Sequence, residues 1–315
     1  MTLEKEHILV IRLGALGDLV FCFQAFHEIR QAHPDADIAL LTREPFAAFA
    51  ASLPWFNRVI IDTHPTFATP VRWLKLRHEI ASFAPSVVYD LQGKNRQTIL
   101  YALLGGPFGP AWSGAAPLCK YPRPWPPAPG MSFPEFMAAQ LRAAGVLSMP
   151  APDLFWFDAP TAKFALPSHY AVLIPGCSPN ALHKRWPPQK FATLAKKLHD
   201  KGLACVAVGT QADEDVVNSI KASVPELMDL CGKTTLFELA GVLRRAALAV
   251  GNDTGPLHIA AVLRTPTVAL FSGKSDPIWS RPPGPNVAWR QSTNLEDLSV
   301  ANVVAAIDTV LNFGD

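Results

Sequence analysis

Short apolar runs alternate with longer segments whose apolar residues recur at helical spacing along most of this chain. In the first half, runs rich in β-branched and aliphatic residues are followed by segments with a helical period. The predicted strands are 8–11, 37–41, 58–61 and 87–90, and the predicted helices are 19–33, 45–51 and 71–83. This alternation is typical of a parallel, doubly wound α/β sheet.

The same alternation resumes in the second half. The predicted strands there are 170–174, 204–208, 248–250 and 267–271, and the predicted helices are 188–201, 212–223, 236–245 and 302–311. Between the halves, 132–144 is predicted as a helix and the polar, proline-broken stretch 148–167 as a linker. We therefore expect two Rossmann-like domains, 1–155 and 156–315, facing a central cleft, with the last helix able to pack back on the first domain.

The pattern is lost in the proline-rich segment 107–134, which is predicted as a loop. One interpretation is a stiff surface connection between regular elements. The other is a functional loop that lines an acceptor pocket. Its candidate residues are Trp112, Lys120, Arg123 and Trp125.

Composition supports a folded protein and limits its partners. Of the 315 residues, 49% are hydrophobic and 17% are charged, which fits large buried sheets. The net charge of +2 is too small to indicate a nucleic-acid partner, so none is expected, although local basic clusters could hold an anionic partner or touch an anionic membrane surface. The five cysteines show no zinc spacing, and neither a signal peptide nor an apolar run of transmembrane length is present, so we expect reduced thiols and a cytoplasmic location.

The segment 250–261 follows a predicted strand and begins a predicted helix. Asp253 or Thr254 could cap that helix, and Pro256 suits its first turn. The free amides of a helix start, with the positive end of its dipole, suit a phosphate, and His258 lies one turn inside. A capped core helix with a buried histidine is the alternative interpretation.

The loop 12–18 follows the first predicted strand. As a dinucleotide fingerprint it is defective, because the third glycine is absent, so a nicotinamide cofactor is not expected. Asp18 could instead accept a proton from a substrate hydroxyl. The alternative is an ordinary first-turn acid that interacts with the helix dipole.

Two further groups follow strands of the second half. Lys184 and Arg185 precede a helix that begins with two prolines, and they could meet a phosphate or simply be solvated above Trp186. Asp213 and Glu214 could accept hydrogen bonds from a ribose or act only as partners of a helix dipole.

Lys94 and Arg96 follow the strand 87–90 and could bind an anionic acceptor, or form a solvated turn. The sequence contains no zinc ligand set, no P-loop lysine pattern and no nucleophile elbow. We therefore expect neither a metal nor a resident cofactor.

Three motifs in this order resemble the bacterial lipopolysaccharide heptosyltransferases, glycosyltransferase family 9. They are the Ile-Arg-Leu-Gly-Ala-Leu-Gly-Asp loop, the Lys-Arg-Trp-Pro turn and the Asn-Asp-Thr-Gly-Pro-Leu-His-Ile-Ala-Ala segment. The resemblance implies a GT-B fold, with the acceptor on the N-terminal domain and the nucleotide sugar on the C-terminal one. It also implies an inverting, metal-independent transfer.

The resemblance implies roles for individual residues. Asp18 matches the catalytic base, and Lys184 matches a phosphate-binding lysine. Asp213 or Glu214 falls near the acid that contacts the ribose. The donor-binding segment is matched by Asp253, Thr254, Gly255 and His258.

The implied activity is transfer of a heptose or related sugar from an ADP-sugar to a lipopolysaccharide core or lipid A precursor, and the expected donor is ADP-heptose. The expected place is the cytoplasm, with peripheral contact on the inner face of the inner membrane. Two other hypotheses stay open. One is a GT-B sugar-nucleotide epimerase, and the other is a non-catalytic sugar-nucleotide-binding module.

Overall fold

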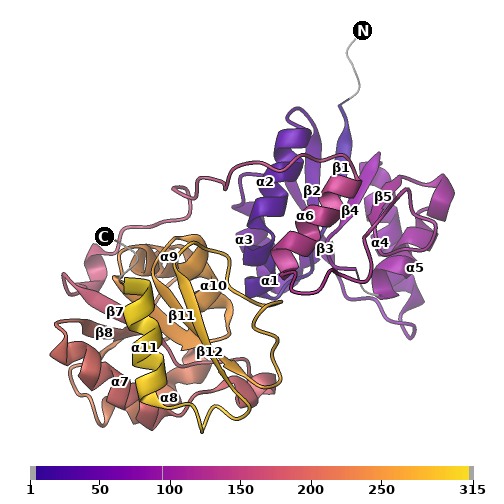
Figure 1. Cartoon of the computed structure of the whole chain (residues 1–315). Helices are drawn as coiled ribbons and strands as arrows, with labels where there is room; N and C mark the ends of the chain where they lie inside the picture. Colours follow the sequence, from indigo (N-terminus) through magenta and orange to yellow (C-terminus); the bar gives the residue numbers. More distant parts are fainter. Residues whose placement is uncertain (1–4, 94, 312–315) are drawn as a thin grey trace. The chain divides into compact units, whose positions relative to one another are not determined.

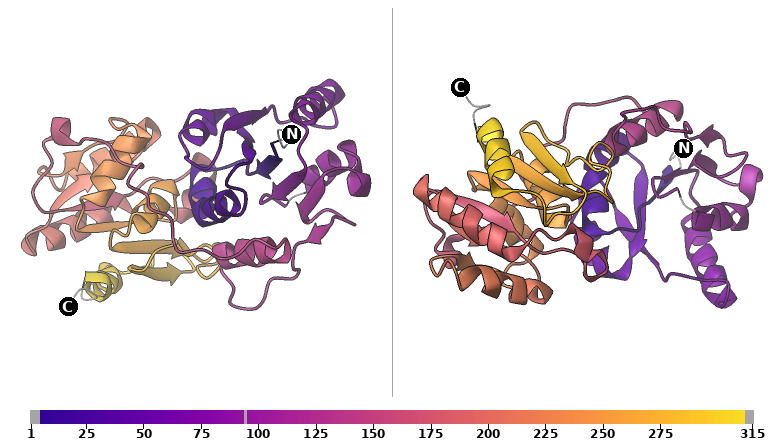
Figure 2. Two further views of the ribbon diagram at one scale, coloured as in Figure 1. Left: turned by 90° about the horizontal axis from the view of Figure 1, so that it is seen from above. Right: turned by 60° about the horizontal axis from the view of Figure 1, so that its bottom comes forward.

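The structure, a computed structural model, describes residues 5–93 and 95–311. The chain forms two compact units, which divide between Pro152 and Asp153. Each unit contains a six-stranded parallel sheet. Helices cover both faces of each sheet, as Figures 1 and 2 show. The prediction of an α/β fold with two doubly wound parallel sheets is therefore confirmed.

In the first unit the strand order is β3-β2-β1-β4-β5-β6. The strands are β1 (His7–Ile11), β2 (Asp37–Arg43), β3 (Arg58–Asp62), β4 (Val87–Asp90), β5 (Ala111–Gly114) and β6 (Tyr121–Pro122). The α-helices are α1 (Leu16–Phe21), α2 (Phe23–Ala32), α3 (Ala47–Ala51), α4 (Pro70–Phe83), α5 (Asn95–Leu103) and α6 (Phe133–Ala143). Short 3-10 turns are η1 (Glu44–Phe46) and η2 (Gly106–Phe108).

The central strand β1 explains why this unit is a three-layer structure. Residues 8–11 are all buried, because helices cover both faces of a parallel sheet. One face packs against α4 and α5 through a cluster that includes Leu9, Ile11, Trp73 and Trp112. The helices α1, α2, α3 and α6 belong to the other layer. The loops that follow the parallel strands all lie at the carboxyl edge of the sheet.

The prediction of a structureless loop over 107–134 was wrong in part. The strand β5 pairs with β4, and the short β6 pairs with β5 at the edge of the sheet. Trp112 is fully buried, so hydrophobic burial orders β5 despite the surrounding prolines. An edge strand tolerates Pro122 because one side of it needs no ladder hydrogen bond.

In the second unit the strand order is β12-β11-β10-β7-β8-β9. The strands are β7 (Tyr170–Ile174), β8 (Ala204–Ala207), β9 (Met228–Asp229), β10 (Leu248–Asn252), β11 (Thr267–Ser272) and β12 (Val287–Ser292). The α-helices are α7 (Pro188–Asp200), α8 (Glu214–Lys221), α9 (Leu236–Arg244), α10 (Gly255–Val262) and α11 (Val300–Leu311). The 3-10 turns are η3 (Ala162–Phe164), η4 (Pro179–Lys184) and η5 (Gln211–Asp213).

The last helix, α11, packs on the sheet of its own unit. The apolar face of α11, including Val303 and Ile307, is buried in the core of its own unit together with residues of α7 and α8. An amphipathic helix has one apolar face, and here the sheet of the second unit occupies it. The apolar face of this helix therefore belongs to the core of the second unit, and its expected contact with the first domain stays a prediction.

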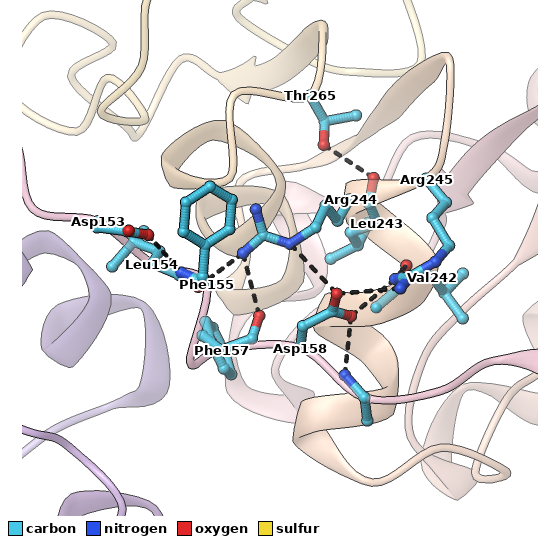
Figure 3. Close-up of polar contacts among 12 residues, drawn as sticks. Asp153, Leu154, Phe155, Phe157, Asp158, Val242, Leu243, Arg244, Arg245 and Thr265 are labelled. Atoms are coloured by element: carbon cyan, nitrogen blue, oxygen red, sulfur yellow. Dashed lines mark hydrogen bonds and ion pairs between the residues drawn. The ribbon is translucent and has the colours of Figure 1, made fainter.

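The segment that enters the second unit is held by two arginines of the α9 end, as Figure 3 shows. Arg244 donates to the carbonyl of Leu154 at 2.7 Å, and Arg245 forms an ion pair with Asp158 at 2.7 Å. The hydrogen bond from Arg245 lowers the pKa of Asp158, so the pair stays charged. The later part of the predicted linker is thus an anchored part of the second unit.

Within the described ranges 5–93 and 95–311, no helix is both long and apolar enough to span a membrane.

Candidate functional site

Asp18 lies in the first turn of α1, at the carboxyl edge of the first sheet. One carboxylate oxygen pairs with the Arg12 guanidinium at 2.9 Å, and the other accepts from the Ala15 amide at 2.8 Å. Arg12 is buried and also donates to the carbonyl of Leu91 at 2.7 Å. Because the Asp18 side chain is 42% exposed, this oriented carboxylate remains accessible to a substrate.

Gly14 sets the shape of this loop. Its φ of +91° lies in the region that side chains rarely adopt, and an added Cβ would lie 2.3 Å from the Phe46 ring. Leu13 donates its amide to the Gln92 side chain at 3.1 Å, which ties the loop after β1 to the loop after β4. The loop that carries Asp18 is therefore packed against Phe46 and bonded to Gln92.

A basic pocket of about 170 Å³ adjoins this loop within the first unit. It lies at the carboxyl edge of the sheet, where the loops after β1, β2, β3 and β4 meet. Its lining residues are Leu13, Gly14, Arg43, His64, Gln92, Arg96 and Gln97. Two arginines and a histidine in one small pocket favour an anionic ligand.

The pocket has one cation held by an acid, and two buried polar atoms of its lining have no hydrogen-bond partner among the described residues. Arg96 pairs with buried Asp62 at 2.5 Å, and its guanidinium lies 5.4 Å from the centroid of the Trp73 ring. The buried Nε atom of Arg96 and the buried Oε1 atom of Gln97 are these two atoms. Arg96 is therefore not part of a solvated turn, and Lys94, its predicted companion, lies outside the described residues.

The residues predicted from the proline-rich segment do not form an acceptor pocket together. Trp112 is a core residue, whereas Trp125 is 77% exposed. Arg123 donates to the carbonyl of Asp90 and to the side chain of Gln140, each at 2.7 Å. Burial lowers the pKa of Arg123 and raises that of Asp90, as expected for a polar network inside the unit.

Three predicted residues of the second unit meet at the start of α10. Asp253 follows β10, and its two carboxylate oxygens accept separate partners. Lys184 from η4 lies 2.5 Å from one oxygen, and His258 from the first turns of α10 lies 3.2 Å from the other. Residues 69 positions apart in the sequence thus form one charged cluster.

The ionisation of Asp253 follows from this cluster. Burial alone would raise its pKa, but the hydrogen bond from His258 and the charges of His258 and Lys184 outweigh burial and lower the pKa. Asp253 is therefore a carboxylate at neutral pH that holds the Lys184 ammonium and the His258 ring in place. An anion that enters between these donors would replace part of this pairing.

The start of α10 differs in detail from the predicted cap. Thr254 stands at the N-cap position, but its side chain makes no capping hydrogen bond and donates to the carbonyl of Asn252 at 3.3 Å. Pro256 has no amide hydrogen, and Leu257 donates to Thr254. No described backbone hydrogen bond uses the Gly255 amide, so this first-turn amide can donate to a ligand.

Asn252 joins the loop after β7 to the end of β10. Its side chain is fully buried, accepts from the Trp186 amide at 3.0 Å and donates to the carbonyls of Pro175 and Gly176. These bonds hold the segment between Gly176 and Trp186, which carries Lys184. Asn252 therefore positions Lys184 without belonging to the charged cluster.

The structure separates the two acids that the sequence could not separate. Asp213 is buried, accepts from Thr210 in a capping box and lies 3.6 Å from Arg185. An added Cβ at Gly176 would lie 2.4 Å from the Asp213 carboxyl carbon. Glu214 is exposed in the first turn of α8, so its carboxylate is the accessible one.

The part of the chain with the charged cluster also carries the family relationship. A family model, glycosyltransferase family 9 (heptosyltransferase), matches residues 138–300. The chain belongs to glycosyltransferase family 9. Within the described residues of this family member, no group of three or more His, Cys, Asp and Glu side chains is arranged to hold a metal.

Several curated relatives carry heptosyltransferase names. Lipopolysaccharide heptosyltransferase 3 of Escherichia coli is 31% identical over 45% of this chain and 47% of its own length. Lipooligosaccharide heptosyltransferase 2 of Haemophilus ducreyi is 24% identical over 87% of this chain and 85% of its own length. Against the first curated relatives, the matched region spans 30 to 47% of their length.

Solved structures of the family share the fold. Escherichia coli ADP-heptose lps heptosyltransferase II aligns with a TM-score of 0.74 and 22% identity, over 97% of this chain and 98% of its own. The Escherichia coli heptosyltransferase WaaC with ADP aligns with a TM-score of 0.75 and 19% identity, over 96% of this chain and 99% of its own. These alignments support the GT-B assignment of the chain.

Several residues of the candidate site were not predicted as site residues. Arg12 holds Asp18, and Asn252 holds the segment that carries Lys184, although both residues stand inside the recognised motifs. Arg43 and His64 line the basic pocket but stand outside those motifs. For Arg43 and His64, the one signal in the sequence is that each follows a predicted strand.

Proposed function

We propose that this protein is a heptosyltransferase that moves a heptose from ADP-heptose to a lipopolysaccharide core or lipid A precursor. The observation that carries the proposal is the charged cluster of Lys184, Asp253 and His258 at the start of α10. The cluster lies in the region that matches the family model, and a related structure was solved with an ADP-heptose analogue.

In this proposal the second unit, from Asp153 onward, binds the nucleotide sugar. Lys184 and His258 stabilise the charge that grows on the leaving diphosphate, and the Gly255 amide adds a donor at the positive end of α10. Thr254 contributes its hydroxyl to the same phosphates. Asp213 shapes the neighbouring loop, so we assign the ribose contact to the exposed Glu214.

The first unit supplies the base. The acceptor hydroxyl oxygen attacks the anomeric carbon, the bond from that carbon to the diphosphate oxygen breaks, and ADP leaves with the bonding electrons. Asp18 takes the hydroxyl proton, and attack opposite the leaving group inverts the anomeric configuration. The ion pair with Arg12 supports this role because it fixes the direction of the carboxylate.

The basic pocket beside Asp18 is the proposed contact for an anionic group of the acceptor. Arg43, His64 and Arg96 line it, and the unpartnered oxygen of Gln97 suits a hydroxyl of the same ligand. Lys94 stays a proposed acceptor contact from its place in the sequence. The reaction would occur in the cytoplasm, at the inner face of the inner membrane, where a lipid-linked acceptor is available.

The proposal is tested first by thermal unfolding with a panel of nucleotide sugars. Ligands that bind the folded state raise Tm by mass action, so ADP-heptose and ADP are expected to raise it while UDP-sugars do not. Stabilisation by UDP-sugars alone would contradict the choice of donor. Release of a free isomerised sugar without acceptor would favour the epimerase hypothesis, and binding without turnover would favour the non-catalytic one.

A further inference from the structure

The loop before α4 and the first turns of that helix expose apolar side chains to solvent. Phe67 is 91% exposed, Val71 is 61% exposed and Leu74 is 60% exposed. These three residues, with the adjacent Arg72 and Lys75, are called the α4 outer face below. None of them contributes to the proposed chemistry. Exposed apolar side chains that lie together indicate an interaction surface.

Helix geometry explains why this face has no partner within the unit. Trp73, Leu76 and Ile80 form the buried stripe of α4. At 100° per residue, Val71 and Leu74 project to the side opposite that stripe, together with Lys75, whereas Arg72 projects from the flank of the helix, about 100° from Val71. The helix is therefore apolar on two sides, with the sheet covering only one of them.

The turn before the helix presents Phe67 outward. The Thr69 amide donates to the Thr66 carbonyl at 3.0 Å, and the Thr66 amide donates to the Thr69 hydroxyl at 2.8 Å. Phe67 occupies a corner position of this closed turn. An aromatic side chain is thus held at the tip of an ordered loop, four residues before Val71.

Cations surround these apolar side chains. Arg72 and Lys75 are exposed, and neither takes part in any ion pair formed by the described residues. Arg77 adds a further exposed cation, and Glu79 is the single acid of α4. Apolar side chains with unpaired cations beside them match the chemistry of an anionic lipid surface.

We infer that the α4 outer face docks on the surface of a bilayer that contains anionic lipids. Phe67, Val71 and Leu74 enter the boundary between headgroups and acyl chains, and Arg72 and Lys75 contact lipid phosphates. The same β3–α4 loop carries His64, which lines the basic pocket. The purpose of this contact, which is to bring a lipid-linked acceptor near that pocket, rests on the proposed function. The contact itself does not.

The test is co-sedimentation of the full chain with vesicles of phosphatidylcholine or of an equimolar mixture with phosphatidylglycerol. The wild type is expected to prefer the anionic vesicles. Arg72→Gln with Lys75→Gln is expected to weaken binding to them about twenty-five-fold, from about five-fold per cation. Phe67→Ser with Leu74→Ser is expected to weaken it about ten-fold.

Matched controls come from exposed residues elsewhere in the chain. Lys196→Gln with Lys197→Gln removes two exposed cations of α7, and Phe108→Ser removes a side chain that is 97% exposed. Both controls are expected to bind vesicles like the wild type. Equal losses in the controls and in the α4 variants would overturn the inference, as would equal binding of the wild type to both kinds of vesicle.

Self-association is the competing use of this face. A wild-type dimer that dissociates on Phe67→Ser with Leu74→Ser, in the absence of lipid, would assign the face to a second copy and overturn the inference. Transfer to a delipidated acceptor distinguishes the two proposals. If the proposed function holds, the α4 variants transfer the sugar to the delipidated acceptor as the wild type does. If the wild type itself does not transfer the sugar, the proposed function is contradicted, and vesicle binding stands as a separate result.

Discussion

The charged cluster makes a quantitative prediction for Asp253→Asn. The substitution keeps the shape of the side chain but leaves the buried His258 and the partly buried Lys184 without their shared carboxylate. Loss of one member of a buried ion pair costs about 3–5 kcal/mol, and we expect about 2–3 kcal/mol because the Lys184 side chain is 28% exposed. At about 2–4 °C per kcal/mol, Tm of the second unit should fall by about 4–12 °C.

The pH dependence of the same variant follows from the lowered pKa of Asp253. A carboxyl group with a depressed folded-state pKa contributes its stabilisation above its ordinary pKa and loses it as pH falls through the folded-state value. The difference between wild type and variant, measured by urea unfolding, should therefore be full at neutral pH and shrink below about pH 4.

Asp308→Asn is the matched control. The Lys201–Asp308 pair has the same distance of 2.5 Å, but both side chains are 48% exposed. Exposed pairs contribute about 0–1 kcal/mol, so this variant should unfold close to the wild type. Similar losses in the two variants, or a loss for Asp253→Asn that does not change with pH, would refute the reasoning.

Three further substitutions test other parts of the site. Gly14→Ala should lower the free energy of unfolding in urea by about 2–4 kcal/mol. Gly130 also has a positive φ but nothing within 4 Å of an added Cβ, so Gly130→Ala should lower it by about 1 kcal/mol. Equal losses would refute the contact with Phe46. Lys184→Gln should weaken ADP-heptose binding about 10–100-fold in calorimetry, and an unchanged Kd would remove Lys184 from the donor site. Arg96→Gln should raise KM for the acceptor about ten-fold with donor Kd unchanged, and a parallel change in both would contradict its acceptor role.

Strong hydrophobic patterns predicted most of the fold. The strands β1, β2, β7 and β10 are buried runs of aliphatic residues, and the sequence predicts each of them within two residues of its bounds. Burial on both faces of a parallel sheet leaves this pattern in the sequence. Elements without such a pattern were missed.

The missed strands lie towards the edges of the sheets. The strand β12 (Val287–Ser292) is only half-buried and contains Arg290 and Gln291, so no apolar run marks it. The strand β9 has two residues, and β6 contains a proline. Their positions depend on pairing with β11, β8 and β5, which is long-range information that a local pattern does not contain.

The site was predicted unevenly for the same reason. Lys184, Asp253 and His258 stand in recognisable motifs, and the structure brings them together. Whether Asp213 or Glu214 is accessible depended on which of them caps the helix, and their neighbouring positions in the sequence do not contain that information. Contacts between loops that follow different strands, such as the Arg96–Asp62 pair, emerge only from the folded sheet.

Transfer from ADP-heptose tests the central claim most directly. With a heptose-deficient lipopolysaccharide acceptor, the protein should release one ADP for each heptose added, with inverted anomeric configuration. Asp18→Asn should lower kcat by about 10²–10⁴-fold while the Kd for ADP-heptose stays near that of the wild type. Full turnover by Asp18→Asn, or donor binding without transfer to any acceptor by the wild type, would contradict the account.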